Sequence, residues 1–249
     1  MYTIYQLKKT IFSMEAAFAF VVALGCYIFF GEFYIQFDHD FLDTFTRVQD
    51  DGLLLVIFPM LVSLPAAVKA VPELESGYFR LAIPKATFRK YAVTRLAVNG
   101  LTGGALLTAP AALYLLRIIA AKGIQAEAYD LERNMIDIRL CQGLYDSYPM
   151  AYALLVLGCI FLCGAAFATL ALGVGALTQK KYLALLLPQI YYVGTAIVFP
   201  KHVKALDATT LYVVNSNVHA SMLVILLYDL LLTAVGAFLF VKGVKKNVS

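Results

Sequence analysis

The chain has 249 residues, of which 61% are hydrophobic and 14% are charged, and its mean hydropathy is +0.78. Soluble domains are only about 45–50% apolar, so this composition excludes a soluble globular protein and indicates an integral membrane protein surrounded by lipid. The net charge of +4 is divided unevenly between the two sides of the expected membrane domain. It therefore does not indicate a nucleic-acid partner.

Six apolar runs are long enough to cross a bilayer as helices, since about 20 mainly apolar residues span the hydrocarbon. They predict an all-α integral membrane fold with one transmembrane domain over residues 1–249 and no separate soluble catalytic domain. No small-residue cleavage site follows the first run, so we do not expect a removable signal peptide. The predicted spans are Ala16–Ile35, Leu53–Val71, Leu96–Leu116, Met150–Leu177, Leu183–Phe199 and Ala220–Val241.

The basic residues predict the orientation. Most of the 20 Lys and Arg residues fall in segments that an alternating topology places on one side, and most carboxylates fall on the other. Because Lys and Arg accumulate in cytoplasmic loops, both termini and residues 72–92 are predicted to be cytoplasmic. The expected location is the cytoplasmic (inner or plasma) membrane.

The segments around span 1 predict two short helices. Residues 1–15 carry Ile4, Leu7 and Ile11 at helical spacing, which favours an interfacial helix over a simple cytoplasmic end of span 1. In the acidic loop after span 1, Phe41, Phe45 and Val48 recur at helical spacing. This pattern predicts an amphipathic helix resting on the outer surface, with a solvated acidic face favoured over an acidic vestibule.

Small residues line up at intervals of four in spans 3 and 4, as in Gly100 and Gly104 and in Thr169 and Gly173. Such ridges let membrane helices approach closely. They predict a compact bundle and are compatible with a dimer. The long loop Ile118–Pro149 is expected to carry a further external helix.

Span 5 is short and contains Pro188, and residues 200–219 are too polar for a span and too apolar for an ordinary loop. This intermediate character favours a re-entrant segment over a surface loop. Asp229 is a carboxylate deep in an apolar run of span 6. Intramembrane charges are costly and are functional candidates by default, although a structural role for Asp229 is equally compatible with the sequence.

Catalytic and nucleotide-binding motifs are absent from the sequence. There is no G-x-x-x-x-G-K-[ST] phosphate loop, no hydrolase or kinase signature, and no metal-ligand spacing among the histidines. We therefore expect no catalytic residue, bound cofactor or metal in this chain, and no enzymatic activity of its own.

The charged loop between spans 2 and 3 resembles the corresponding region of type-2 permease subunits of ATP-binding-cassette exporters. In that family, E-x-E-x-G is followed by a Leu, a Pro and basic residues before the next helix. The matching residues here are Glu73, Glu75, Gly77, Leu81, Pro84, Arg89, Tyr91 and Arg95. The six spans, the interfacial helix and the broken segment before span 6 extend the resemblance over the whole chain.

The resemblance implies that residues 72–92 form a cytoplasmic coupling helix that docks on a separate ATPase subunit, which binds ATP and Mg²⁺. A second permease copy or a paralogue would complete the path, and membrane lipid would surround it. The implied coupling residues are Glu73, Glu75, Gly77, Arg80 and Arg89. The alternative is a basic interfacial loop that only reflects the membrane orientation.

The family also implies that spans 1, 2 and 5 rock about a central path. Short loops and the lack of a large external domain favour an amphipathic or antimicrobial peptide, or a hydrophobic drug, as the substrate, in export or immunity. Pro59 and Pro65 should bend span 2. The aromatic candidates suit the lining of such a path, but they are equally compatible with ordinary packing in the core. The candidate path residues are Phe18, Tyr27, Pro59, Pro65, Tyr191, Tyr192 and Asp229.

Two other functions remain open. An ion- or proton-coupled secondary transporter would use Asp229 and draw its energy from a gradient. A membrane assembly or sensor protein would transport nothing and would show no nucleotide-dependent change.

Overall fold

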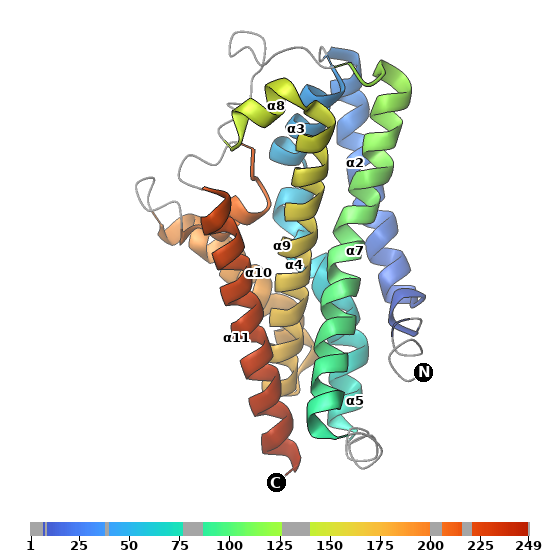
Figure 1. The fold of residues 1–249 in the computed structure, drawn as a ribbon. Coiled ribbons are helices and arrows are strands. Elements are labelled where there is room, and N and C mark those ends of the chain that lie inside the picture. The colour runs from blue at the N-terminus through green and yellow to red at the C-terminus, as the bar shows by residue number, and fades with distance from the viewer. Residues whose placement is uncertain are drawn as a thin grey trace.

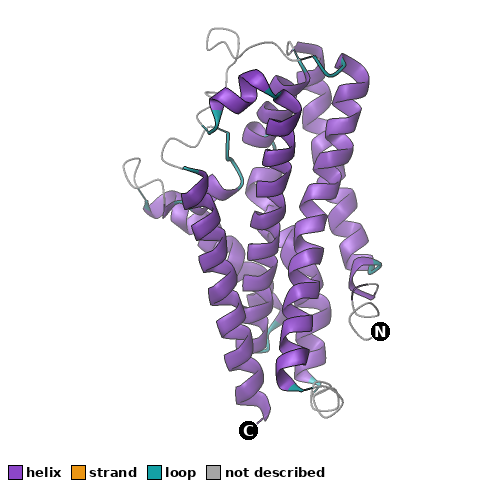
Figure 2. Ribbon diagram, in the orientation of Figure 1, coloured by secondary structure: helices purple, strands orange, loops and turns teal. Residues whose placement is uncertain are grey.

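The computed structural model is all-helical over the residues that it describes, and six of its helices are long and apolar enough to cross a membrane (Figures 1 and 2). The chain is therefore a multi-pass membrane protein, as the composition predicts. The described residues are 7, 9–37, 40–76, 87–125, 140–199, 206–215 and 221–248. The elements are α2 (Met14–Phe37), α3 (Phe41–Asp51), α4 (Leu54–Pro65), the π-helical turn η1 (Ala66–Ala70), α5 (Val71–Glu75), α7 (Phe88–Lys122), α8 (Gln142–Ser147), α9 (Pro149–Thr178), α10 (Lys181–Val198), the 3-10 helix η3 (Ala208–Leu211) and α11 (Met222–Val248).

Helix α9 lies at the centre of the bundle and packs against α7, α11, α10 and α4 (Figure 1). The end of α5, the start of α7 and the C-terminus lie at one end of the bundle, and α3 and α8 lie at the other. This placement is compatible with the predicted topology. Which end faces the cytoplasm stays a prediction.

Helix α7 extends beyond its apolar run at both ends because helix ends are set by capping groups. Helix α7 begins after Thr87, whose hydroxyl accepts a hydrogen bond from the Lys90 amide, and it stops at Gly123 with φ +84°. Glycine adopts this left-handed conformation readily, so it ends helices. The predicted span Leu96–Leu116 is therefore the central part of a longer helix.

Span 2 is one continuous helix made of α4, η1 and α5. Pro59 and Pro65 both lie inside α4 and are buried. Proline removes a backbone donor and clashes with the preceding turn, and the π-helical turn begins directly after Pro65. The irregularity predicted from these prolines thus takes the form of a wide helical turn, a feature that is frequent at functional sites.

Helix α3 is present as predicted, but its predicted surface position is wrong. All nine residues from Phe41 to Gln49 are buried, because α2, α4, α7 and α9 surround the helix. Its polar groups find partners inside the bundle: the Asp40 carboxylate caps the first turn at 2.8 Å from two amides, and Arg47 pairs with Asp43 at 3.5 Å.

The re-entrant segment predicted at 200–219 is described only over residues 206–215. There the 3-10 helix and the following residues pack inside the bundle, with Ala208, Leu211, Tyr212 and Val214 all buried. A surface loop is excluded for this part. A helix pair stays a prediction. The interfacial helix at 1–15 and the coupling helix also stay predictions, because residues 1–6 and 8 and residues 77–86 lie outside the described ranges.

The glycine ridges do bring helices together at α9. A Cβ on Gly164 would lie 2.7 Å from the carbonyl oxygen of Gly103 on α7, and a Cβ on Gly173 would collide with the Gly236 carbonyl of α11. Membrane helices associate largely by van der Waals packing, which requires such close approach. These crossings hold α7 and α11 directly against the backbone of α9.

Gly164→Val should therefore destabilise the bundle. Overpacking costs about 1–3 kcal/mol, and each 1 kcal/mol lowers the melting temperature by about 2–4 °C in a chain of this size. Gly158 on the same helix has no atom within 4 Å of a built Cβ, so Gly158→Val is the matched control. Melting of the purified variants in detergent checks this, and equal melting temperatures would contradict the proposed crossing.

Candidate functional site

An ion-pair hub at Glu73 joins three elements at the end of the bundle where α5 ends and α7 begins. The Lys9 ammonium lies 2.8 Å from one carboxylate oxygen of Glu73, and the Arg95 guanidinium pairs with the other. Lys69 adds a hydrogen bond of 3.2 Å to the Lys9 carbonyl and an ion pair of 3.6 Å with Glu15. The N-terminal segment, span 2 and span 3 are thus connected through charges.

The Glu73–Arg95 pair is largely shielded, since Arg95 is only 8% exposed and the Glu73 side chain 19%, whereas the Lys9 side chain is 44% exposed. Exposed pairs contribute little to stability, but attraction between charges grows as water is excluded. Removing one member of such a group leaves the others uncompensated. The Glu73–Arg95 pair is therefore the strongest connection in the hub.

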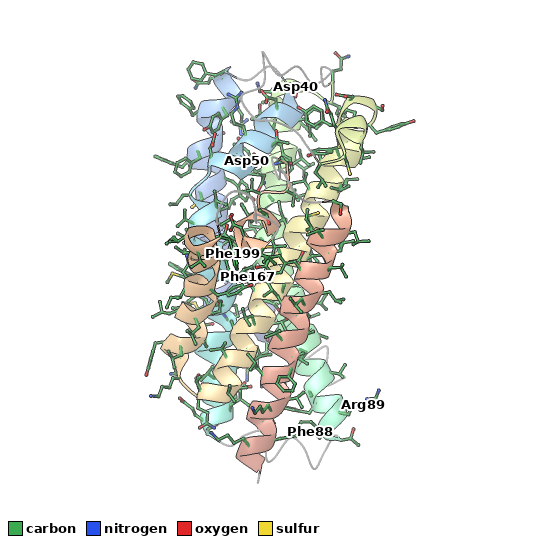
Figure 3. All side chains as sticks on the ribbon, turned by 90° about the vertical axis from the view of Figure 1, so that its left-hand side faces the viewer. Asp40, Asp50, Phe88, Arg89, Phe167 and Phe199 are labelled. Atoms are coloured by element: carbon green, nitrogen blue, oxygen red, sulfur yellow. The ribbon has the colours of Figure 1, made fainter. Side chains whose placement is uncertain are left out.

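The residues implied by the family resemblance occupy different positions around this hub. Glu73 is engaged with Lys9 and Arg95, whereas Glu75 and Arg89 are exposed, and Figure 3 labels Arg89 at this end of the molecule. Two others, Gly77 and Arg80, lie outside the described residues. Glu75 and Arg89 are consequently accessible to a partner, and Glu73 is not.

An aromatic cluster occupies the interior between α4, α9, α10 and the segment after η3. The ring of Phe58 stacks on Tyr212 with centroids 4.8 Å apart and meets Tyr192 edge-on at 4.9 Å and Phe167 edge-on at 5.3 Å. All four side chains are at most 2% exposed. Figure 3 places Phe167 between the end that carries Asp40 and the end that carries Arg89.

A hydroxyl network links this cluster to α2 and α3. The Tyr27 hydroxyl donates a hydrogen bond of 3.1 Å to the side-chain amide oxygen of Gln49, and it lies 3.1 Å from the Tyr212 hydroxyl. The Tyr27 ring stacks on Tyr114 of α7 with centroids 5.6 Å apart. Burial raises the pKa of Tyr212 well above its ordinary value, so this hydroxyl stays protonated.

Asn215 makes a second polar connection inside the bundle. Its amide carbonyl accepts a hydrogen bond of 3.0 Å from Tyr152 of α9, and its amide nitrogen donates to the Asp50 carboxylate of α3 at 3.2 Å. The short helix α3 and the segment that follows η3 are therefore connected to each other as well as to the spans around them.

The candidate path residues do not form a single lining. Tyr27 and Tyr192 belong to the hydroxyl network and the aromatic cluster, whereas Phe18 is 61% exposed on the outer face of α2. Tyr191 lies beside the cluster and shares a hydrogen bond of 2.7 Å with Tyr228. Pro59 and Pro65 are buried in α4, and Asp229 is buried in α11.

An apolar groove of about 650 Å³ separates α10 from α11. Both helices pack on α9, and the groove is lined by Leu206, Leu227, Leu230 and Leu231 and their apolar neighbours. The Tyr228 hydroxyl crosses it, donating to the Leu206 carbonyl at 2.9 Å. The volume lies within the range of about 300–1,000 Å³ that is usual for ligand pockets.

The sequence reasoning missed the partners of the key residues. Gln49 lies in a helix expected on the outer surface, Asn215 in the segment expected to be re-entrant, and Arg95 in the expected charged loop. The available signal was a polar side chain beside an apolar helical stripe, which for Gln49 means the position four residues after Phe45. Over the described ranges, no group of three or more His, Cys, Asp or Glu side chains could hold a metal ion.

Comparison with known proteins gives no relative: no protein-family model matches the sequence, and neither the curated proteins nor the solved structures contain a match.

Tyr27→Phe should destabilise the protein, because it removes two buried hydrogen bonds and leaves the Gln49 carbonyl without its tyrosine donor. An unsatisfied buried group costs about 1–3 kcal/mol, which corresponds to a fall of several degrees in melting temperature. Tyr148 is 67% exposed, so Tyr148→Phe is the control. A Tyr27→Phe protein that melts like this control would refute the structural importance of the network.

Proposed function

We propose that this chain is the membrane permease subunit of an ATP-driven exporter of the ATP-binding-cassette type. Separate ATPase subunits would hydrolyse ATP, and a second permease copy or a paralogue would complete the translocation path. The observation that supports this best is the Glu73 hub, which connects the N-terminal segment, span 2 and span 3 beside exposed charges of both signs. These are the elements that an ATPase would have to move.

The proposed mechanism begins at the exposed charges. An ATPase subunit docks on Glu75 and Arg89, and its closure displaces the end of α5. The hub transmits this displacement to Lys9 and Arg95 because the ion pairs are partly shielded from water. The helix then carries the motion through η1 to Phe58, which contacts Tyr192 and Tyr212 in the bundle interior.

The proposed substrate is an amphipathic or antimicrobial peptide or a hydrophobic drug. The groove between α10 and α11 favours such a molecule because its walls are apolar and its polar groups are few, mainly the hydroxyls of Tyr191, Thr195 and Tyr228. A compound that partitions into the bilayer can reach a groove of this kind from the side. The segments between the predicted spans are too short to form a large external domain that captures a soluble polymer.

Glu75→Lys should uncouple the partner ATPase while leaving the permease intact. The side chain is exposed, so the melting temperature should stay unchanged, whereas binding to an ATP-binding-cassette ATPase encoded beside this gene should be lost. Glu73→Lys, which breaks the hub, should instead lower the melting temperature. Co-purification and substrate-stimulated ATP hydrolysis in proteoliposomes measure the first effect.

The matched control for docking is Arg117→Glu, a charge reversal at an exposed residue near the other end of α7, away from Glu75 and Arg89. It should not weaken the complex. A permease that binds no neighbouring ATPase, or one that binds and couples equally well with Glu75→Lys, would contradict the proposal.

The second candidate is an ion- or proton-coupled secondary transporter, and the burial of Asp229 at 4% exposure favours it. In that case, Asp229→Asn should abolish gradient-driven transport in proteoliposomes that contain this chain alone. Transport that requires an ATPase and survives Asp229→Asn would exclude this second candidate.

A further inference from the structure

Asp229 lies on the face of α11 that packs against α9. It is 4% exposed, and Ile225 and Leu232, one turn before it and one after it, are 1% and 5% exposed. Two turns further on, a Cβ on Gly236 would lie 2.7 Å from the backbone of Thr169 and Leu170. The carboxyl group is therefore enclosed in a tight helix interface within the membrane.

Neither carboxylate oxygen of Asp229 has a hydrogen-bond partner among the residues that the structure describes. The titratable groups that interact with it there are the thiols of Cys159 and Cys163 on α9 and the phenol of Tyr228 on its own helix. All three are uncharged in their ordinary state. An ionised carboxylate that is 4% exposed and has no countercharge among the described residues around it would be very costly.

The surroundings of Asp229 limit what could bind there. Metal cations such as Ca²⁺ require about 6–8 oxygen ligands, and over the described ranges no acidic, His or Cys cluster suits a metal. Asp229 itself is only 4% exposed, so an organic cation could reach the carboxyl group only if the helices separated. A proton needs neither ligands nor volume.

Tyr228, the residue before Asp229, points to another side of α11 and fixes the rotation of the helix. Its hydroxyl donates to the Leu206 carbonyl at 2.9 Å and lies 2.7 Å from the Tyr191 hydroxyl of α10. Any rotation of α11 that carries Asp229 out of the α9 interface must break these hydrogen bonds. The two residues thus hold α11 from two sides.

We propose that Asp229 is a proton-binding site that controls the packing of α11 on α9. In the closed bundle the side chain is a carboxylic acid. When its O–H bond breaks and the proton passes to water, the carboxylate can no longer remain against α9, and α11 turns it toward the groove shared with α10. This inference concerns the chain alone and stands whether or not an ATPase drives transport.

Infrared spectroscopy of the full-length protein in lipid nanodiscs tests the protonation directly. At neutral pH the wild type should show the carbonyl stretch of a protonated carboxylic acid, which disappears on alkaline titration. Asp229→Asn should lack this band, whereas Glu32→Gln should keep it, because Glu32 is exposed and paired with Arg117 at 3.0 Å. A wild type without the band at neutral pH overturns the proposal, and this result needs no variant.

The dependence of stability on pH gives a second test. If the folded chain holds a proton that the unfolded chain has lost, stability falls as the pH rises, by up to about tenfold in the unfolding constant per pH unit. Asp229→Asn should remove this contribution, so its melting temperature should depend less on pH than that of Glu32→Gln. Equal pH dependence in both variants overturns the proposal.

Tyr228→Phe tests the connection to helix rotation. Without the hydroxyl bonds to Tyr191 and Leu206, α11 should turn more easily, and the infrared band should be lost at a lower pH than in the wild type. Tyr148→Phe should leave the titration unchanged. A titration that Tyr228→Phe does not shift contradicts the rotation step.

Discussion

The fold depends on the absence of side chains at the crossings of α9. In a bilayer the lipid is as apolar as the helices, so packing must supply the association. Gly164 and Gly173 allow α7 and α11 to reach the backbone of α9, and the Asn99 side chain reinforces the first crossing by donating to the Ala168 carbonyl at 2.6 Å. Asp229 is buried in the same interface between α11 and α9.

Two short segments fill the interior that the spans leave open. Helix α3 and residues 206–215 both pack inside the bundle, and short helices in such a place expose many backbone groups that need partners. Asp40 satisfies the start of α3, and Asp207 satisfies η3 through the Thr209 amide at 2.9 Å. Tyr27 and Asn215 then connect both segments to the spans.

The spans were predictable because a bilayer imposes a minimum length of apolar helix, and that requirement is local in the sequence. The burial of α3 was not predictable. Its polar side chains have partners far away in the sequence: Gln49 accepts a hydrogen bond from Tyr27, and Asp50 accepts one from Asn215, 165 residues later. Without knowledge of these partners, the sequence of α3 resembles that of an exposed amphipathic helix. Asp229 was recognised as unusual from its span alone, whereas its lack of a described partner required the structure.

The same limit applies to Glu73. The sequence alone favours Glu73 as a loop residue that docks on a partner protein. In the structure, however, Glu73 pairs with Lys9 and Arg95 and so connects segments of its own chain. Span 2 contributes both Glu73 to the charged hub and Phe58 to the aromatic cluster. Span 2 also packs on α10, where the Gln189 side chain donates to the Val56 carbonyl at 2.7 Å. A displacement of α5 would therefore be absorbed at the π-helical turn or passed on to α10. The hydroxyls of Tyr191 and Tyr228 connect α10 to α11 across the groove. A displacement passed to α10 would therefore act on the hydrogen bond that, in our proposal, holds the rotation of α11.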